Sequence, residues 1–141
     1  MRVPLCQSQA MTENEARMLP PLKLAYIGDA VWELMIGTQL VYRGLSVRHI
    51  HKEAVARVNA KAQSQTLNRI LPLLTEAEED IARRGRNAHP HHAAPKHQEQ
   101  ADYSAATGLE ALMGYLYLTG QEERLKQLFD ASQMEGEACL K

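Results

Sequence analysis

The sequence predicts an all-α helical bundle, and three observations support this prediction. Apolar residues recur at the spacing of a helix along most of the 141 residues. Capping residues, glycines and prolines divide these stretches into about six helices, and no stretch shows the alternation of a half-buried strand. The length suits one main domain over 20–131, preceded by an extension over 1–19 with a short helix and followed by a tail over 132–141.

The first two predicted helices are separated by a pair of prolines. Thr12 and Glu15 form a capping-box pattern before a short helix that ends at Pro20. A long helix over 22–42 follows, because its apolar residues return every three or four positions. Gly44 lies just after this helix and can end it.

The middle of the chain predicts two further helices and a loop. Ser46 can cap a segment whose apolar residues continue as far as Leu71. Thr75 begins a helix near 76–87, in which acidic residues come first and arginines last, as the helix dipole favours. Residues 88–100 contain prolines and histidines but no hydrophobic period, so we expect a loop there.

Two more helices complete the predicted bundle. One covers 102–119 and ends at Gly120, and an amphipathic helix follows it through Phe129. Glycine is unfavourable inside a helix unless two helix backbones approach closely. Four such glycines predict that the helices over 22–42 and 102–119 pack tightly: Gly28, Gly37, Gly108 and Gly114.

Composition excludes several classes of protein. No apolar run reaches the roughly 18–20 residues that a membrane-spanning helix needs, and the start of the chain is too short in apolar residues for a signal sequence. Cys6 and Cys139 form neither a metal-binding pair nor a disulfide framework. We therefore expect a cytoplasmic protein with no membrane partner.

Basic residues are concentrated in the middle of the chain. The net charge is −1 overall, but residues 34–75 have six basic residues and one acid, and 81–98 have four basic residues and none. Solvated helix faces would explain this, yet three arginines in four positions before a basic loop favour contact with nucleic-acid phosphates. The candidate RNA-binding residues are Arg83, Arg84, Arg86 and Lys96, and then Lys61.

Two acids lie in apolar surroundings within the predicted helices. Asp29 follows Gly28 in the first long helix, and Glu110 lies between Gly108 and Gly114 in the other. A surface or salt-bridged carboxylate is the alternative for each acid alone. If the two helices pack closely, the two carboxylates can hold a hard cation such as Mg²⁺. Such an ion beside a phosphodiester predicts its hydrolysis.

These residues resemble those of a known family. Residues 24–31 (Leu-Ala-Tyr-Ile-Gly-Asp-Ala-Val) resemble the signature helix of ribonuclease III domains, and 109–115 resemble their second catalytic helix. Residues 84–88 (Arg-Gly-Arg-Asn-Ala), with their spacing to 104–107, and 114–118 resemble Mini-ribonuclease III, a bacterial group without a double-stranded-RNA-binding domain. The resemblance covers about residues 20–130.

The resemblance implies an endoribonuclease and its site. Asp29 and Glu110 would be the catalytic metal ligands, with Mg²⁺ as cofactor, in an all-α homodimer that carries double-stranded RNA across both subunits. Cleavage would leave 5′-phosphate and 3′-hydroxyl ends on the stem of precursor large-subunit (23S) ribosomal RNA. A ribosomal protein that shapes this RNA is a candidate partner.

The sequence departs from the larger ribonuclease III pattern at three positions. Ordinary members place a glutamate where this chain has Ala25, another near Leu22, and an aspartate at Thr107. This departure favours one firmly held Mg²⁺. The Thr107 hydroxyl lies one turn before Glu110 and could bond a metal-bound water, and Glu33 could reach the site or form a structural salt bridge.

Three alternatives remain open from the sequence. The first is a non-catalytic RNA-binding or ribosome-assembly protein that keeps the fold. The second is a helical carboxylate-metal protein unrelated to RNA, although no paired Glu-x-x-His motif supports it. The third is a zinc site at the histidines of 88–100, but their spacing and the lack of a nearby cysteine make a loop that touches RNA the better prediction.

Overall fold

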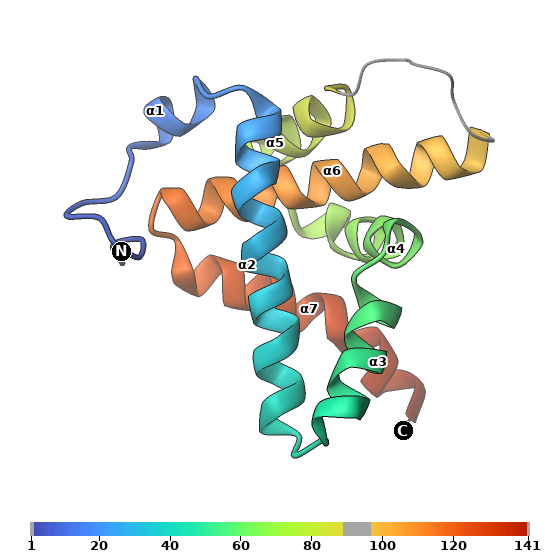
Figure 1. Cartoon of the computed structure of the whole chain (residues 1–141). Coiled ribbons are helices and arrows are strands. Elements are labelled where there is room, and N and C mark those ends of the chain that lie inside the picture. Colours follow the sequence, from blue (N-terminus) through green and yellow to red (C-terminus); the bar gives the residue numbers. More distant parts are fainter. Residues whose placement is uncertain (1, 89–96, 141) are drawn as a thin grey trace.

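The computed structural model describes residues 2–88 and 97–140, and over these residues the chain is helical without strands (Figure 1). This confirms the all-α prediction. The described elements are α1 (Glu13–Arg17), α2 (Pro21–Tyr42), α3 (Val47–Arg57), α4 (Ala60–Ile70), the short 3₁₀ helix η1 (Leu71–Leu73), α5 (Glu76–Arg86), α6 (His97–Leu118) and α7 (Glu122–Leu140).

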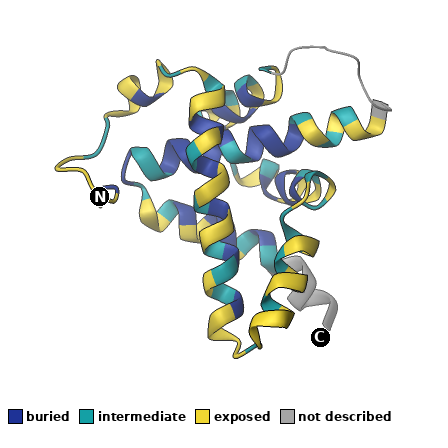
Figure 2. Ribbon diagram, in the orientation of Figure 1, coloured by how far each residue is buried: buried dark blue, intermediate teal, exposed yellow. Residues whose placement is uncertain are grey.

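Helix α6 forms the centre of the bundle. It packs against α2, α4 and α5, and more weakly against α7 and α1. In Figure 1 it passes behind α2, with α5 above it and α4 below it. Its middle residues are completely buried (Figure 2), and Leu109, Leu112 and Leu116 expose none of their surface. Every other long element except α3 therefore buries its apolar side against or around this one helix.

Helices α2 and α6 touch through their backbones at two glycines. A Cβ on Gly28 would lie 1.6 Å from the carbonyl oxygen of Glu110, and one on Gly114 would lie 1.9 Å from the carbonyl oxygen of Leu24. The predicted close packing of these helices is confirmed. Gly37 does not contribute to it, because a Cβ there would meet nothing within 4 Å.

A second glycine contact joins α5 to α6. A Cβ on Gly108 would lie 2.7 Å from the carbonyl oxygen of Ala82, and one on Gly85 would lie 2.8 Å from the Cβ of Ala111. The two helices therefore approach as closely as their backbones allow. The basic end of α5 is fixed beside α6 in this way.

The segment after Ser46 is two helices, and its prediction as one was wrong. The chain leaves helical geometry at Val58 (φ −113°, ψ 65°), and Asn59 caps the next helix. The Asn59 side chain accepts from the amide of Ala62 at 2.9 Å and donates to the carbonyl oxygen of Val55 at 3.1 Å. One asparagine therefore satisfies the end of α3 and the start of α4.

Other boundaries agree more closely. Both capping boxes are present, at Thr12 and at Thr75. Helix α6 begins at His97, so the predicted loop over 88–100 is shorter than expected at its end, and most of it lies outside the described residues. The predicted tail after 131 continues the backbone of α7 to Leu140. None of the helices in the described part of the chain is long and apolar enough to cross a membrane.

Candidate functional site

The crossing of α2 and α6 brings two carboxylates together. Gly28 rests on the backbone of Glu110, so its neighbour Asp29 lies near the Glu110 side chain, close enough to raise the pKa of the Glu110 carboxyl. Glu33, one turn further along α2, adds its negative charge to the same place. The predicted convergence of Asp29 and Glu110 is therefore present. One detail differs: Asp29 is exposed, and only Glu110 is partly buried.

The crowding of acids changes the protonation of Glu110. Burial raises the pKa of the Glu110 carboxyl to about 8, and the hydrogen bond with Asp29 and the negative charges of Asp29 and Glu33 act in the same direction. The nearby Gln63 side chain opposes them, because its amide favours the charged form of the Glu110 carboxyl and so lowers its pKa. In the metal-free protein at neutral pH, Glu110 thus keeps a proton that a bound cation would displace.

This donor set fits a hard divalent cation. Mg²⁺ is usually held by one or two carboxylates and keeps several of its waters. Within residues 2–88 and 97–140, no group of three or more His, Cys, Asp or Glu side chains has the geometry of a metal site. Asp29 and Glu110 would therefore hold the ion together with water and a substrate phosphate. Ala25 and Thr107, at two positions where the resemblance implies further acids, are both buried.

Thr107 lies one turn before Glu110, as the sequence predicted. Its side chain is buried, and its hydroxyl donates to the carbonyl oxygen of Tyr103 at 3.1 Å. The proton of this hydroxyl is therefore used within α6 itself. A contact between Thr107 and a metal-bound water stays a prediction that would have to use its oxygen as acceptor.

Two of the predicted RNA-binding arginines already have partners within the protein. The Arg84 guanidinium donates to the carbonyl oxygens of Arg17 at 2.9 Å and of Leu19 at 3.4 Å, which ties α5 to the link between α1 and α2. Arg83 forms an ion pair with Asp80 one turn earlier. Arg84 thus has a structural role that the sequence did not reveal.

The remaining basic candidates have different surroundings. Arg86 at the end of α5 and Lys61 on α4 are exposed, so both can reach a phosphate. Lys96 lies outside the described residues, as do the histidines from 89 to 92. Sequence reasoning missed Gln63 of α4, which is 4% exposed beside Glu110. Its signal was a polar residue at a buried position of an amphipathic helix.

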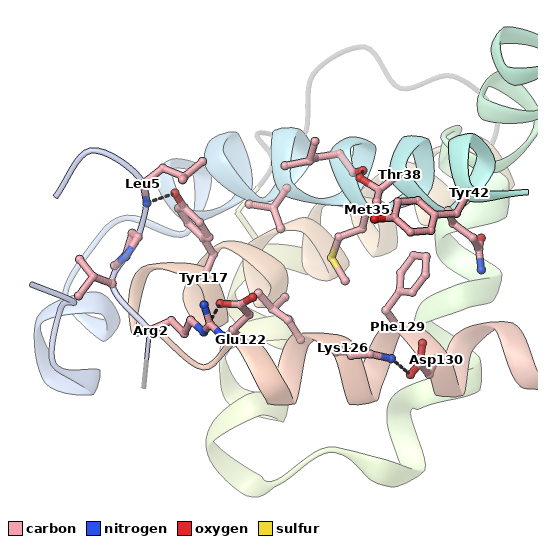
Figure 3. A pocket seen from close by; sticks show the side chains of 17 residues that line it. Arg2, Leu5, Met35, Thr38, Tyr42, Tyr117, Glu122, Lys126, Phe129 and Asp130 are labelled. Atoms are coloured by element: carbon pink, nitrogen blue, oxygen red, sulfur yellow. Dashed lines mark hydrogen bonds and ion pairs between the residues drawn. The ribbon is translucent and has the colours of Figure 1, made fainter. Parts of the chain in front are cut away.

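A separate apolar groove lies between α2 and α7. Its volume is about 660 Å³, and Figure 3 shows Met35 and Tyr42 of α2 facing Phe129 of α7 across it. The charges at its rim are paired, for example Lys126 with Asp130 at 2.7 Å. With an apolar lining and paired charges, the groove suits a protein surface better than phosphodiester chemistry.

Comparisons with known proteins agree with this arrangement. The Ribonuclease III domain family matches residues 22–121. A protein of Symbiobacterium thermophilum named Mini-ribonuclease 3 is 50% identical over 115 residues, which cover 81% of this chain and 88% of that protein. A Mini-ribonuclease 3 of Thermoanaerobacter sp. is 47% identical, covering 89% of this chain and 88% of that protein. A crystal structure of a protein from Fusobacterium nucleatum superposes with a TM-score of 0.72 at 34% identity, covering 81% of this chain and 92% of the other.

Proposed function

Because the chain belongs to the ribonuclease III family, in its Mini-ribonuclease III group, and is an endoribonuclease of that type, we propose that it cleaves double-stranded RNA with Mg²⁺. The family acts on double-stranded RNA and works with divalent metal ions. One observation carries the proposal: the backbone contact of Gly28 with Glu110 brings the Asp29 and Glu110 carboxyl groups together at the α2–α6 crossing, where burial and the neighbouring acids raise the pKa of Glu110 to about 8.

The roles of the residues follow from their positions. Asp29 and Glu110 would hold the cation, which would supply a water molecule of lowered pKa and positive charge beside the phosphate. Glu33 adds negative charge that favours a cation at the site. Arg86 and Lys61, both exposed, contact the phosphates of the duplex outside the reacting bond.

The proposed substrate is the duplex stem of precursor 23S ribosomal RNA. The resemblance to the Mini-ribonuclease III group supports this choice, with 5′-phosphate and 3′-hydroxyl ends as products. The matched family region covers residues 22–121, and the exposed basic candidates within its described part are Arg83, Arg86 and Lys61. We therefore expect weak affinity for arbitrary duplexes, and we propose a ribosomal protein that shapes the RNA as partner.

The active form is proposed to be a homodimer. Helix α2 buries one face in the core, yet its opposite face also carries large apolar side chains that are exposed: Leu22, Tyr26, Leu34 and Val41. Figure 2 shows this exposed side along the front of α2. A helix that is apolar on both sides normally covers both. The groove of Figure 3 continues this surface, because Leu34 also lines it, and a second copy of the chain is the proposed occupant.

The dimer is tested by light scattering on the purified protein. We expect twice the chain mass of 15.8 kDa, and a monomer for Leu34→Arg at the same concentration. A wild-type monomer at all concentrations would refute the dimer.

The catalytic proposal is tested with a labelled RNA duplex, with Mg²⁺ and with chelator. Wild type should cut the duplex only with Mg²⁺, and Asp29→Asn and Glu110→Gln should bind the duplex without cutting it. Glu123→Gln, which changes an exposed acid of α7, is the matched control and should cut normally. Binding without cleavage by wild type would instead favour the non-catalytic RNA-binding protein.

A further inference from the structure

Gln63 is a buried polar side chain that its own helix does not explain. It lies on the face of α4 that packs toward the core, next to Thr66 and Leu67, and it is 4% exposed. Thr66 is satisfied locally, because its hydroxyl donates to the carbonyl oxygen of Ala62 at 3.0 Å and accepts from Arg69. The Nε2 of Gln63 has no hydrogen-bond partner of normal geometry in the described residues and no contact with solvent.

An orphaned donor of this kind is unusual. Buried amide groups are nearly always hydrogen bonded, because burial removes their hydrogen bonds to water and an amide without a protein partner bears this cost in full. Trp32 Nε1 is the other donor without a partner among the described side chains. The Trp32 ring, however, packs edge-on against the ring of Phe129, with 5.3 Å between the ring centroids. Gln63 has no aromatic packing role of this kind, so its buried amide needs a hydrogen-bond acceptor nearby.

The acceptor that the structure offers is Glu110. Helix α4 packs directly on α6, and the Gln63 side chain lies close enough to Glu110 to lower the pKa of its carboxyl. Asp29 approaches the same carboxyl group from α2. Three helices thus contribute to one site.

We propose that Gln63 is a positioning residue, whose Nε2 donates to one oxygen of Glu110 and so holds the carboxylate toward Asp29 and the cation they share. The proposal rests on the function proposed above. Partners that orient a metal ligand typically change metal affinity by about 10–100-fold when they are removed. Gln63 therefore acts through Glu110 and need not touch the RNA.

The test compares Gln63→Met with Gln65→Met. Methionine keeps the length of the side chain and removes the donor, and Gln65 is an exposed glutamine of the same helix. Mg²⁺ is titrated into the metal-free protein without RNA, by calorimetry and by the rise in melting temperature that the ion causes. We expect Gln63→Met to bind Mg²⁺ about tenfold more weakly, with an unchanged or higher melting temperature before metal is added.

Cleavage of the RNA duplex supplies a second readout. At a fixed low Mg²⁺ concentration, the Gln63→Met variant should have a lower kcat than wild type and a similar KM for RNA. Raising the Mg²⁺ concentration should restore its kcat. Gln65→Met should match wild type in every measurement. Gln63→Leu replaces Gln63→Met if the methionine variant does not fold, with the same expected results.

Three results would overturn the inference. Mg²⁺ affinity equal to that of wild type shows that Gln63 does not orient a ligand. A lower melting temperature in the metal-free variant, with the full rise on adding Mg²⁺, shows a role in packing only. Wild type that neither binds Mg²⁺ nor cuts RNA would overturn the proposed function and this inference with it, whereas failure of the Gln63 variants alone leaves the proposed function standing.

Discussion

Replacing Gly28 by alanine should destabilise the protein strongly, although the change adds one methyl group. The added Cβ would lie 1.6 Å from the carbonyl oxygen of Glu110, whereas real Cβ atoms essentially never approach closer than 3.0 Å. The two helices must therefore separate by about 1.4 Å at this point. Because the obstacle is backbone, no side-chain rotation can relieve it.

The magnitude follows from the size of this shift. Overpacking a core usually costs about 1–3 kcal/mol, and separating α2 from α6 also loosens the most extensive contact between helices. We expect a loss of about 3 kcal/mol or more, out of a stability that is typically about 5–15 kcal/mol. At roughly 3–5 °C per kcal/mol, the melting temperature falls by about 10 °C or more.

Gly37→Ala is the matched control in the same helix. A Cβ there meets nothing within 4 Å, so the helix gains about 0.5–1 kcal/mol from replacing glycine by alanine. Both variants are melted by circular dichroism over a range of protein concentrations, which separates effects on folding from effects on dimerisation. Opposite signs are expected, and a Gly28→Ala variant as stable as wild type would refute the backbone contact.

Four further outcomes are expected. Arg84→Met should lower stability by about 1–3 kcal/mol in urea unfolding, because two carbonyl oxygens lose a charged donor. Arg86→Ala should leave stability unchanged and reduce the salt dependence of RNA binding. Burial raises the pKa of Glu78, but hydrogen bonds from Arg124 and from the backbone of the capping threonine outweigh burial and hold the pKa below its ordinary 4.5. The wild-type protein should therefore lose stability as the pH falls below 4.5. Arg124→Ala removes the ion-pair partner of this buried carboxylate and should cost about 3–5 kcal/mol of stability at neutral pH. The pKa of Glu110 is raised to about 8 in the folded metal-free protein, so stability should fall as the pH rises from 4.5 toward 8, and Glu110→Gln should remove this fall. Unfolding curves that do not depend on pH in these ranges would contradict the last two expectations.

The sequence predicted most of the helices because their ends are marked by local chemistry. The threonines at 12 and 75 each precede a glutamate at the capping-box distance, and both boxes are present. The break between α3 and α4 has no glycine or proline to mark it. There the side chain of Asn59 replaces the missing backbone partners. The helical spacing of apolar residues continues across the break, so the sequence pattern predicts one uninterrupted helix.

The site was predictable in part for a different reason. An acid near a glycine in an apolar helix marked both residues: Asp29 follows Gly28 directly, and Glu110 lies two positions after Gly108. The sequence could not show that Asp29 is exposed, because this depends on where α2 passes the edge of α6. Nor could it show that Gln63 lies beside Glu110 or that Arg84 binds backbone carbonyls, since both contacts join helices far apart in the chain.

The glycine contact and the acidic site depend on each other. Packed helices usually lie about 8–10 Å apart, a separation that keeps a short side chain such as that of Asp29 from a carboxyl group on the facing helix. The contact at Gly28 brings the two backbones closer, so that Asp29 reaches Glu110 and raises its pKa. A site with two acids has no further carboxylate to replace a ligand that moves away. Loss of cation binding in Gly28→Ala should therefore occur at temperatures where the variant is still folded, because a shift of about 1.4 Å breaks the site before it unfolds the bundle.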